Sequence, residues 1–313
     1  MMTHISVGVD ISKAKLDVHC LPDGTFRQFD NTQAGFKGLI KWLKDRTVDH
    51  LVYEPTGIYH RAFERAMVDA GLPLFRVGPK QARRFAEATN KLCKTDKADA
   101  LVLAQMGMAL PLRPFQPPSK ILDQMQELLR ARRSLVKDRT AVQNRAEGMQ
   151  LQLLKRQNLA RLKQIDSQIG VIDKEFDRLL RTDAELQARF DILLSIPGIG
   201  RDLAFNLLVD LPELGTLDNK EVAAMVGVAP MTRESGNWKG KANIRGGRRD
   251  LRCRAYMPAL VATRFNPDIK IMYDRLIAKG KPPKVAITAA MRKLVITANA
   301  CIRKMTKWQP ITA

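Results

Sequence analysis

Two aspartates three positions apart, Asp96 and Asp99, stand among lysines in the stretch KTDKADA of residues 94–100. If this stretch is helical, the two side chains share a face and their carboxylates repel each other. One interpretation is structural: Thr95 caps the helix, and the helix dipole favours acids in its first turn. The other is chemical: a divalent cation lies between the carboxylates. The other acids of the chain bear on this choice.

Two further acids end β-rich runs earlier in the chain, Asp10 in SVGVDISK and Glu54 in LVYEPTG. Side chains at the ends of neighbouring strands converge at one edge of a sheet, and a helix carrying the D-x-x-D pair can pack beside that edge. Four carboxylates gathered there cannot all stay ionised without a cation. Hard oxygen ligands suit Mg²⁺ or Mn²⁺, and a pair of such ions catalyses phosphoryl transfer. The predicted metal ligands, which are also the predicted catalytic acids, are Asp10, Glu54, Asp96 and Asp99.

Each acid also has a structural interpretation when it is taken alone. Asp10 can be a turn residue, and Glu54 an ordinary charge at the end of a strand. The combination of two strand-end acids with a D-x-x-D pair at the start of a helix is what favours a site. Two competing acids, Asp17 and Asp45, are interpreted as surface charges.

The patterns along the chain predict an N-terminal α/β domain in residues 1–110. Short β-rich runs come first, with a hairpin turn signal in PDG at 22–24, and strands then alternate with amphipathic helices. Four prolines in PLRPFQPPSK, residues 111–120, exclude a continuous helix and predict a linker.

Beyond the linker the chain is predicted to be mainly helical. Residues 121–187 carry apolar side chains at heptad-like spacing, so we expect a coiled-coil region. Two antiparallel helices within the chain explain this spacing, and so do contacts between subunits, and the sequence leaves both open. We predict that the seam supports an oligomer. Residues 188–313 form the predicted C-terminal domain. The seam residues are Ile165, Ile169, Ile172 and Phe176.

Composition narrows the classes of protein to consider. We recognise no apolar run that approaches the roughly 20 residues of a membrane span. The N-terminus shows no signal-peptide pattern. The four cysteines lie far apart, which is typical of reduced thiols in a cytoplasm. All four histidines fall in the first sixty residues, so a Ser-His-Asp triad in the C-terminal half has no local histidine. We expect a cytoplasmic protein without membrane contact.

The net charge of +21 indicates a polyanionic partner, most often nucleic acid. The excess is concentrated at the C-terminal end, where residues 188–313 hold 22 Lys and Arg against 10 Asp and Glu. A basic surface for membranes or for ribosomal docking is the milder alternative.

Two stretches of the C-terminal region are candidates for contact with phosphates. SIPGIG, between two apolar helical runs, is typical of a helix-hairpin-helix turn, whose N–H groups can face a DNA phosphate; an ordinary corner between two helices is the alternative. A glycine- and arginine-rich stretch, residues 227–254, follows. The predicted nucleic-acid contacts are Gly198, Gly200, Arg245, Arg248, Arg249 and Arg252.

Ser235 lies in a Glu-Ser-Gly turn of that stretch, with Arg233 nearby. A serine hydroxyl is a weak nucleophile until its proton is removed or the developing charge is stabilised. Arginine forks and a metal ion can clamp a phosphate beside it. The residues alone favour a loop whose serine only donates a hydrogen bond to phosphate. Trp238 can stack on a base or fill a loop core.

The motifs GVDISKAKLDV, EPTG and KTDKADA resemble the N-terminal domain of the DEDD insertion-sequence transposases related to the Piv/MooV invertases. SIPGIG, GVAPMTRESG and RCRAYMPALVATR resemble the C-terminal transposase domain of the same family, in the same order. The resemblance therefore covers nearly the whole chain. It implies a RuvC-like, RNase H-type fold for residues 1–110, in which Asp10, Glu54, Asp96 and Asp99 match the catalytic tetrad.

The resemblance also implies a function. Members of the family carry a nucleophilic serine at the matching Glu-Ser-Gly, which makes Ser235 the residue that forms a covalent phosphoserine link to DNA. Some members are guided by a structured bridge RNA. The implied activity is transposition of an insertion sequence, with double-stranded target and donor DNA, a guide RNA, Mg²⁺ or Mn²⁺, and a dimer or tetramer. Two alternatives stay open: a metal-dependent junction nuclease that uses water, and a basic nucleic-acid-binding scaffold without activity.

Overall fold

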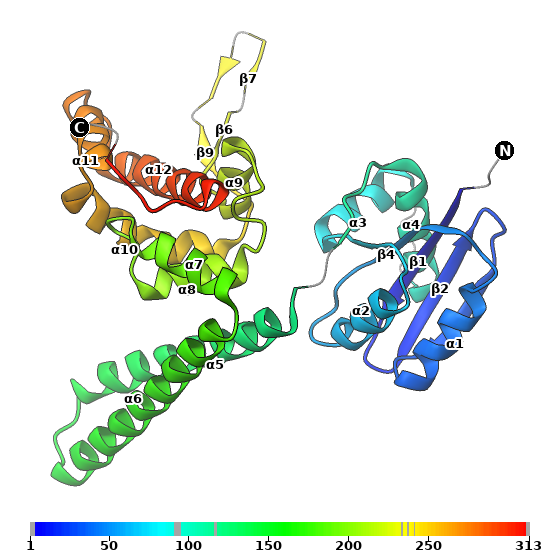
Figure 1. Cartoon of the computed structure of the whole chain (residues 1–313), viewed down its shortest axis with the longest axis horizontal. Helices are drawn as coiled ribbons and strands as arrows, with labels where there is room; N and C mark the ends of the chain where they lie inside the picture. Colours follow the sequence, from blue (N-terminus) through cyan, green and yellow to red (C-terminus); the bar gives the residue numbers. More distant parts are fainter. Residues whose placement is uncertain are drawn as a thin grey trace. The chain divides into compact units, whose positions relative to one another are not determined.

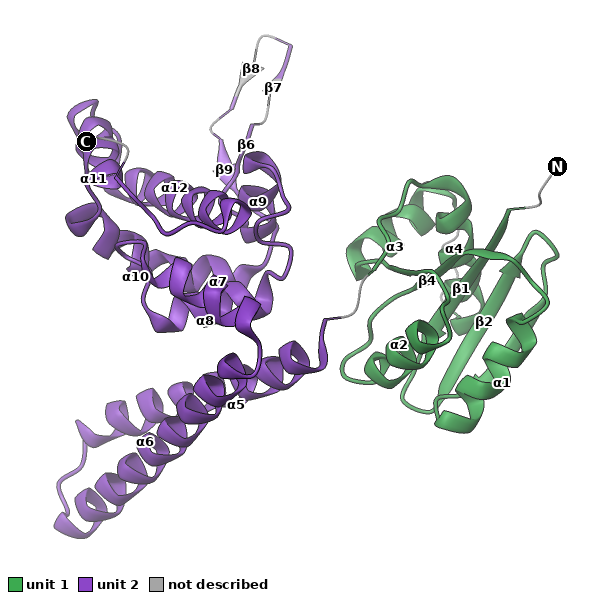
Figure 2. Cartoon of the chain, in the orientation of Figure 1, with its two compact units in different colours: residues 1–117 green, residues 118–313 purple. Residues whose placement is uncertain are grey.

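The chain divides into two compact units, unit 1 (Met1–Pro117) and unit 2 (Pro118–Ala313), which are described separately (Figure 2). Arg233 and the side chain of Trp238 lie outside the described residues. The finer boundaries predicted at 110, 120 and 187 stay proposals. The structure, a computed structural model, describes residues 4–90, 95–115, 118–232, 234–236, 238–240 and 242–310, with the backbone alone at 234, 238 and 239.

Unit 1 is built on a five-stranded sheet of order β3-β2-β1-β4-β5. The first three strands pair antiparallel, whereas β4 pairs parallel with β1 and β5 pairs parallel with β4. This is the RNase H-type topology expected for the RuvC-like fold, so the predicted fold class is confirmed. The strands are β1 (Ile5–Ile11), β2 (Lys15–Leu21), β3 (Phe26–Asp30), β4 (Val48–Tyr53) and β5 (Leu74–Arg76).

The alternation along β1 assigns its side chains to two faces of the sheet. Val7, Val9 and Ile11 are buried in a core that α1 and α2 complete. Ser6 and Gly8 face α4 on the other side. The helices of unit 1 are α1 (Gln33–Leu43), α2 (His60–Asp69), α3 (Pro79–Ala88) and α4 (Asp96–Ala109).

The predicted linker begins as part of unit 1. The N–H of Phe115 donates to the carbonyl of Leu74 at 2.7 Å, and its ring meets Tyr53 edge-on, with 6.2 Å between the ring centroids. The first half of the proline-rich stretch is therefore anchored beside β5. The next helix, α5, begins at Lys120.

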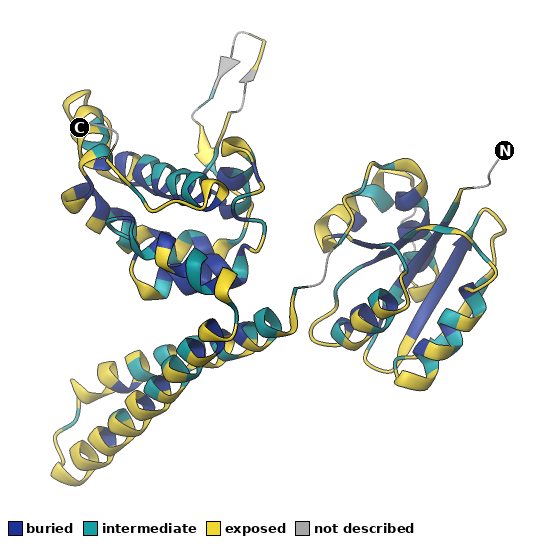
Figure 3. Cartoon of the chain, in the orientation of Figure 1, coloured by how far each residue is buried: buried dark blue, intermediate teal, exposed yellow. Residues whose placement is uncertain are grey.

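Unit 2 contains a long helical hairpin and a helical bundle (Figure 1). Helix α12 packs against α10 at the centre of the bundle. Figure 3 shows that the outer faces of the hairpin helices are exposed. The helices of the described part of unit 2 are α5 (Lys120–Ala146), α6 (Gln152–Arg181), α7 (Ala184–Leu194), α8 (Arg201–Asp210), α9 (Asn219–Val226), α10 (Arg249–Phe265), α11 (Pro267–Ala278) and α12 (Pro283–Lys304).

The hairpin bears on the question that the heptad spacing left open. Helices α5 and α6 run antiparallel and are joined by ion pairs, as between Arg139 and Asp166 at 3.4 Å. Ile165, Ile169 and Phe176 are buried between elements of the same chain. The structure therefore uses most of this apolar surface within the chain and leaves Ile172 only partly buried, and the role of the seam in an oligomer stays a prediction.

The hairpin is also tied to the bundle, at α8. Arg132 bridges Asp173 of α6 and Asp202 of α8, with both contacts at 2.7 Å, while Arg133 hydrogen-bonds Asp210 of α8. The base of the hairpin and the bundle consequently share one hydrophobic core.

Helix α12 is long and apolar enough, by length and composition, to cross a membrane, although half of that window is buried inside unit 2. The sequence-based statement that no apolar run approaches that length is corrected by this helix. In the structure α12 is a core helix whose buried side chains pack in the bundle.

A two-stranded arm interrupts the helices of unit 2. We define the arm as residues 228–247, between α9 and α10. In Figure 1 it projects from the bundle beside α9. The lower part pairs β6 with β9, and the upper part pairs β7 with β8. The strands are β6 (Pro230–Met231), β7 (Glu234–Ser235), β8 (Trp238–Lys239) and β9 (Asn243–Ile244).

Candidate active site

The first turn of α4 lies beside the end of β1 that carries Asp10. Ser6 Oγ donates to the carbonyl of Ala104 at 2.7 Å, and a Cβ on Gly8 would lie 2.0 Å from the carbonyl oxygen of Ala100. Only glycine permits this approach of the helix to the strand. Asp10 follows Gly8 by two residues in β1, and the acids of KTDKADA precede Ala100 in α4. The acids of the helix and the strand therefore lie towards the same, carboxyl end of β1.

The structure confirms the structural interpretation of the D-x-x-D pair, while the chemical one stays a prediction. Thr95 caps α4, because its Oγ1 accepts from the N–H of Ala98 at 3.2 Å. Asp96 is exposed and Asp99 half-buried, and both fall in the first turn. The cap fixes where the helix starts, and thereby places both carboxylates at the edge of the sheet.

The acids predicted from the sequence surround Asp10 electrostatically. Burial raises the pKa of the Asp10 carboxyl from its ordinary 3.8 to about 6, and neighbouring carboxylates add to this effect. Like charges act in this way only at short range. The structure therefore brings the four predicted acids of unit 1 to one edge of the sheet, together with a fifth. The contributing neighbours, largest first, are Asp99, Asp96, Asp17 and Glu54.

The fifth acid, Asp17, was predicted to be a surface charge, and that prediction is wrong. Asp17 stands opposite Asp10 in the β1–β2 ladder and is only 3% exposed. The side-chain amide of Gln28 donates to its Oδ1 at 2.9 Å. The alternation in AKLDV was the available signal, since Asp17 interrupts a buried strand. Asp45 is exposed, as predicted.

A buried polar cluster fixes the end of β4 just before Glu54. The hydroxyl of Tyr53 donates to Glu64 Oε1, and Glu64 lies 3.7 Å from His60 Nε2 and 4.0 Å from Arg76 Nε. Burial, and then the charge of Glu64, raise the pKa of Tyr53, so the tyrosine keeps its proton. Burial, and then the charge of Arg76, lower the pKa of His60. The cluster gives Glu54 a rigid support.

These carboxylates fit a divalent cation that is completed by substrate. Among the described residues, no three or more His, Cys, Asp or Glu side chains are arranged so that they could hold a metal ion by themselves. Mg²⁺ seldom uses sites made of protein ligands alone; it takes one or two carboxylates, with water and substrate phosphate as the other ligands. Burial raises the pKa of Asp10 and the neighbouring carboxylates add to this effect, so a cation bound beside them would favour the ionised form of Asp10.

The predicted helix-hairpin-helix turn joins α7 to α8. Gly198 is turned towards α10, where a Cβ would lie 2.6 Å from Ala262 Cβ. Gly200, the N-cap of α8, has no atom near its missing Cβ and is exposed. Arg201 follows at the start of α8 and pairs with Asp177 of α6. The contacts of both glycines with nucleic acid stay predictions.

Ser235 lies at the turn that closes the upper part of the arm. Its backbone pairs with that of Trp238, the next residue, Gly236, has a φ of 54°, and the serine is exposed. A two-residue connection with a positive φ is the ordinary form of a tight β-hairpin. The hydroxyl is thus presented at a narrow, accessible tip.

Two of the arginines predicted to bind nucleic acid have hydrogen-bond partners within the chain near the base of the arm, and their contacts with nucleic acid stay predictions. Arg252 donates to the carbonyls of Gly246 at 2.7 Å and Gly227 at 3.3 Å, one at each end of the arm. Arg248 binds Glu213 with two hydrogen bonds of 2.7 and 2.9 Å. Burial of Glu213 opposes its ionisation, but Arg248 outweighs this and lowers the pKa of the Glu213 carboxyl.

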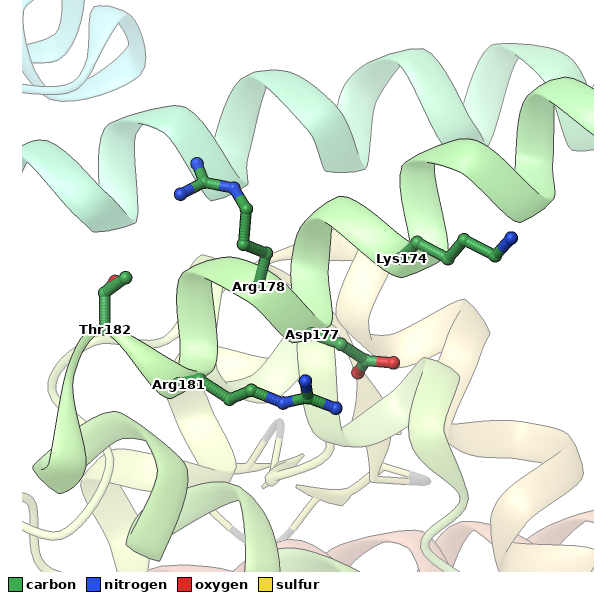
Figure 4. A pocket seen from close by; sticks show the side chains of 5 residues that line it. All are labelled: Lys174, Asp177, Arg178, Arg181 and Thr182. Atoms are coloured by element: carbon green, nitrogen blue, oxygen red, sulfur yellow. The ribbon is translucent and has the colours of Figure 1, made fainter.

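The other two predicted arginines, Arg245 and Arg249, are exposed and have no ion pair among the described residues. A second basic surface lies on the last turns of α6, around a hollow that Figure 4 shows from close by. Within it, Arg178 pairs with Glu175 at 2.6 Å. The hollow is lined by Lys174, Asp177, Arg178, Arg181 and Thr182.

A RuvC-like domain with gathered carboxylates, joined to a basic helical unit, defines a class of proteins that process nucleic acid. Comparisons with known proteins narrow this class. A DEDD transposase model of the IS110 type matches residues 7–155. A model of the transposase IS116/IS110/IS902 family matches residues 190–274. The chain belongs to the IS110-type family of DEDD transposases, and it is a DNA transposase or recombinase.

Two relatives are similar over almost the whole length. The Pilin gene-inverting proteins of Moraxella bovis and Moraxella lacunata are each 29% identical over 318 residues, which is 97% of this chain and 97% of theirs. An uncharacterized 42 kDa protein of insertion element IS900 from Mycobacterium paratuberculosis is 33% identical over 143 residues, 42% of this chain and 35% of that one. The solved T. thermophilus RuvC in complex with a Holliday junction substrate is 13% identical, with a TM-score of 0.29, over 36% of this chain and 100% of that chain.

Proposed function

We propose that this transposase cuts and rejoins DNA through a covalent bond between Ser235 and a DNA phosphate, assisted by the carboxylates of unit 1. The observation that supports the proposal is the exposed position of Ser235 at the tip of an arm whose base is held by Arg252. A serine that only donates a hydrogen bond to a DNA phosphate does not need an arm that is held in one position. A nucleophile has to be held in line with the bond that it breaks.

In the proposed step, Ser235 Oγ forms a bond to phosphorus and the bond from phosphorus to one deoxyribose oxygen breaks. That oxygen leaves with the electron pair and takes up the proton that the serine loses. The bond energy is kept in the phosphoserine link, so a second DNA hydroxyl can reverse the step and join the strands without another energy source.

The proposed site of the metal is formed by Asp10, Glu54, Asp96 and Asp99. A bound Mg²⁺ or Mn²⁺ would stabilise the charge on the phosphate oxygens. Asp10 lies in β1 and Glu54 directly follows β4, while the other two acids lie on the capped first turn of α4. We therefore expect the sheet acids to set the position of the ion, and the helix acids to adjust to the substrate.

We also propose that a structured bridge RNA selects the target and donor DNA. The support is the resemblance of the chain to RNA-guided members of its family, together with the excess of basic residues in 188–313. We propose further that the protein acts in the cytoplasm as a dimer or tetramer, because recombination joins four DNA ends.

The test is a search for a covalent adduct. The protein is incubated with its DNA, its flanking non-coding RNA and Mg²⁺, denatured, and resolved on gels, and the attached peptide is mapped. We expect an adduct on Ser235 that disappears in Ser235→Ala and in Asp99→Asn. Ser167→Ala, which changes an exposed serine of α6, is the matched control and should react normally.

The outcomes separate the proposal from its rivals. Nicked DNA without an adduct would identify a nuclease that uses water, with Ser235 as a contact residue. Binding that is indifferent to all four acids, with no cleavage, would identify a scaffold. Strand exchange that persists without the RNA would contradict guidance by RNA, but it would not contradict the proposed role of Ser235.

A further inference from the structure

Two large apolar side chains, Ile58 and Tyr59, are exposed in the loop that follows Glu54. Ile58 is 66% exposed and Tyr59 37%. The described part of unit 1 has one other exposed large hydrophobic residue, Met108, near the far end of α4. Exposed apolar surface of this kind is thus concentrated directly beside the candidate active site, where it has no role in the core.

Hydrogen bonds fix the backbone of this loop, so the exposure of Ile58 and Tyr59 is a feature of an ordered turn. The N–H of Tyr59 donates to the carbonyl of Thr56 at 3.0 Å, which closes a turn. The side-chain amide of Asn31 donates to the carbonyl of Tyr59 at 3.2 Å and to that of Ser12 at 2.8 Å. The loop after Glu54 is thereby fastened to the turn after Asp10.

This double hydrogen bond places the backbone of the apolar pair beside the turn that follows Asp10. Because one nitrogen binds both carbonyl oxygens, those of Ser12 and Tyr59 lie no more than about 6 Å apart. Ser12 follows Asp10 by two residues, and Tyr59 follows Glu54 by five. A phosphate at the carboxylates would therefore have its neighbouring nucleotide, or the next one, at Ile58 and Tyr59.

The surroundings fit a nucleotide strand. Lys13, in the turn that Asn31 binds, is exposed and has no ion pair among the described residues. The first turn of α2, directly after Tyr59, contains no acidic residue. A strand that leaves the carboxylates in this direction consequently meets an apolar surface flanked by positive charge, which suits a base and its phosphate.

A protein partner fits this surface less well. Stable protein interfaces bury at least about 1,000 Å², far more than two neighbouring side chains supply. One base has two flat apolar faces of about the size of a tyrosine ring, and stacking on an aromatic side chain is a common way to hold an unpaired base. Apolar side chains also act as wedges between base steps.

We infer that Ile58 and Tyr59 form a platform for one unpaired nucleobase of the strand whose phosphate enters the carboxylate site. Tyr59 stacks on the base, and Ile58 covers the adjacent step and keeps the base from restacking. The inference rests on the proposed function in one respect, namely that the carboxylates receive the scissile phosphate. It does not depend on whether Ser235 or water attacks.

The test pairs changes of the platform with removal of single bases. All proteins carry Asp99→Asn to prevent cleavage, and binding is measured to DNA strands with one abasic position moved stepwise along the cutting site. We expect Tyr59→Ala to weaken binding to intact DNA about tenfold, the scale of one base stacked on an aromatic ring. On the strand that lacks the stacked base, one or two nucleotides from the scissile phosphate, Tyr59→Ala should have no effect.

Three variants complete the experiment. Tyr59→Phe keeps the ring and should bind like the parent, Ile58→Ala should weaken binding to intact DNA alone, and Met108→Ala is the control at the other end of α4. The inference is overturned if Tyr59→Ala acts equally on every abasic strand, or no more than Met108→Ala. It is also overturned if Tyr59→Ala changes subunit number in light scattering without changing DNA binding. Adduct formation on Ser235 is measured separately, so the DNA-binding results can be interpreted even if no adduct forms.

Discussion

Asp17 stands directly across from Asp10 in the β1–β2 ladder, and both carboxylates lie on the side of the sheet that α4 covers. Residues paired across antiparallel strands have Cβ atoms about 4.5–5.5 Å apart. Two acids at that distance in a partly buried site repel strongly unless one holds a proton or a cation intervenes. Gln28 gives Asp17 one hydrogen bond but no charge.

We predict that Asp17→Asn stabilises the metal-free protein at neutral pH. An asparagine keeps the hydrogen bond from Gln28, and its amide can donate to Asp10, so repulsion is replaced by attraction. Metal-free Asp17→Asn should melt at a higher temperature than the parent, and the gain from added Mg²⁺ should be smaller. Asp45→Asn, which removes an exposed charge, should show neither effect. A lower melting temperature with an unchanged response to Mg²⁺ would make Asp17 a purely structural residue.

The pH dependence of the metal-free protein follows from the pKa of Asp10. This pKa is about 6 in the folded chain and 3.8 ordinarily, so between these values the folded state binds more protons than the unfolded state. Stability from Asp10 is therefore present at low pH and is lost as pH rises from about 4 to 6. The difference between parent and Asp10→Asn, measured by urea unfolding at each pH, isolates this contribution. Saturating Mg²⁺ at pH 7 should restore what was lost, and a flat difference curve would contradict the assignment.

Much of the site could be predicted from sequence, because strand-end acids and a capped D-x-x-D helix are local patterns. Glu54 and the α4 acids lie within electrostatic range of Asp10, and their joint role in a metal site stays a prediction. Asp17 was missed for a specific reason: its position opposite Asp10 depends on the register of the β1–β2 hairpin. A shift of one residue would have turned it to the other face.

The arginines illustrate what local patterns omit. Arg248 and Arg252 look like phosphate contacts in a glycine-rich basic stretch. One meets Glu213, 35 residues earlier, and the other meets backbone carbonyls at both ends of the arm. Composition shows that a guanidinium is present, but a distant partner decides whether it is available. The heptad seam is a similar case, since periodicity shows an apolar face and not the identity of what covers it.

The hairpin seam leads to a stability prediction. Phe176 is fully buried in the core that α6 shares with the bundle, and its ring centroid lies 4.5 Å from the ring centroid of Phe205. Phe176→Ala should lower the free energy of unfolding by about 3–5 kcal/mol, measured by urea denaturation. Val171, 65% exposed on the same helix, is the matched control, and Val171→Ala should change stability little. Dissociation of an oligomer by Phe176→Ala, with subunit stability intact, would show that the seam is a subunit contact.

The arginines of the arm should separate into two functional groups. Replacing Arg245 and Arg249 with Ala removes exposed charges, so the slope of log affinity against log salt should flatten by about 0.9 for each duplex phosphate that the variant no longer neutralises. Arg252→Ala frees the carbonyls of Gly227 and Gly246 without removing an exposed charge. It should leave the salt slope almost unchanged and slow the formation of the Ser235 adduct.

The tight packing at the base of the arm supports this division. A Cβ on Gly247 would lie 2.4 Å from the backbone nitrogen of Gly227, so the two ends of the arm touch, and Arg252 closes them from the side. Arg252→Lys keeps the charge but loses the planar fork, and should slow adduct formation while binding DNA like the parent. If Arg252→Ala instead flattens the salt slope as much as Arg249→Ala and leaves the adduct rate per bound complex unchanged, Arg252 is a phosphate contact and the arm is positioned by other means.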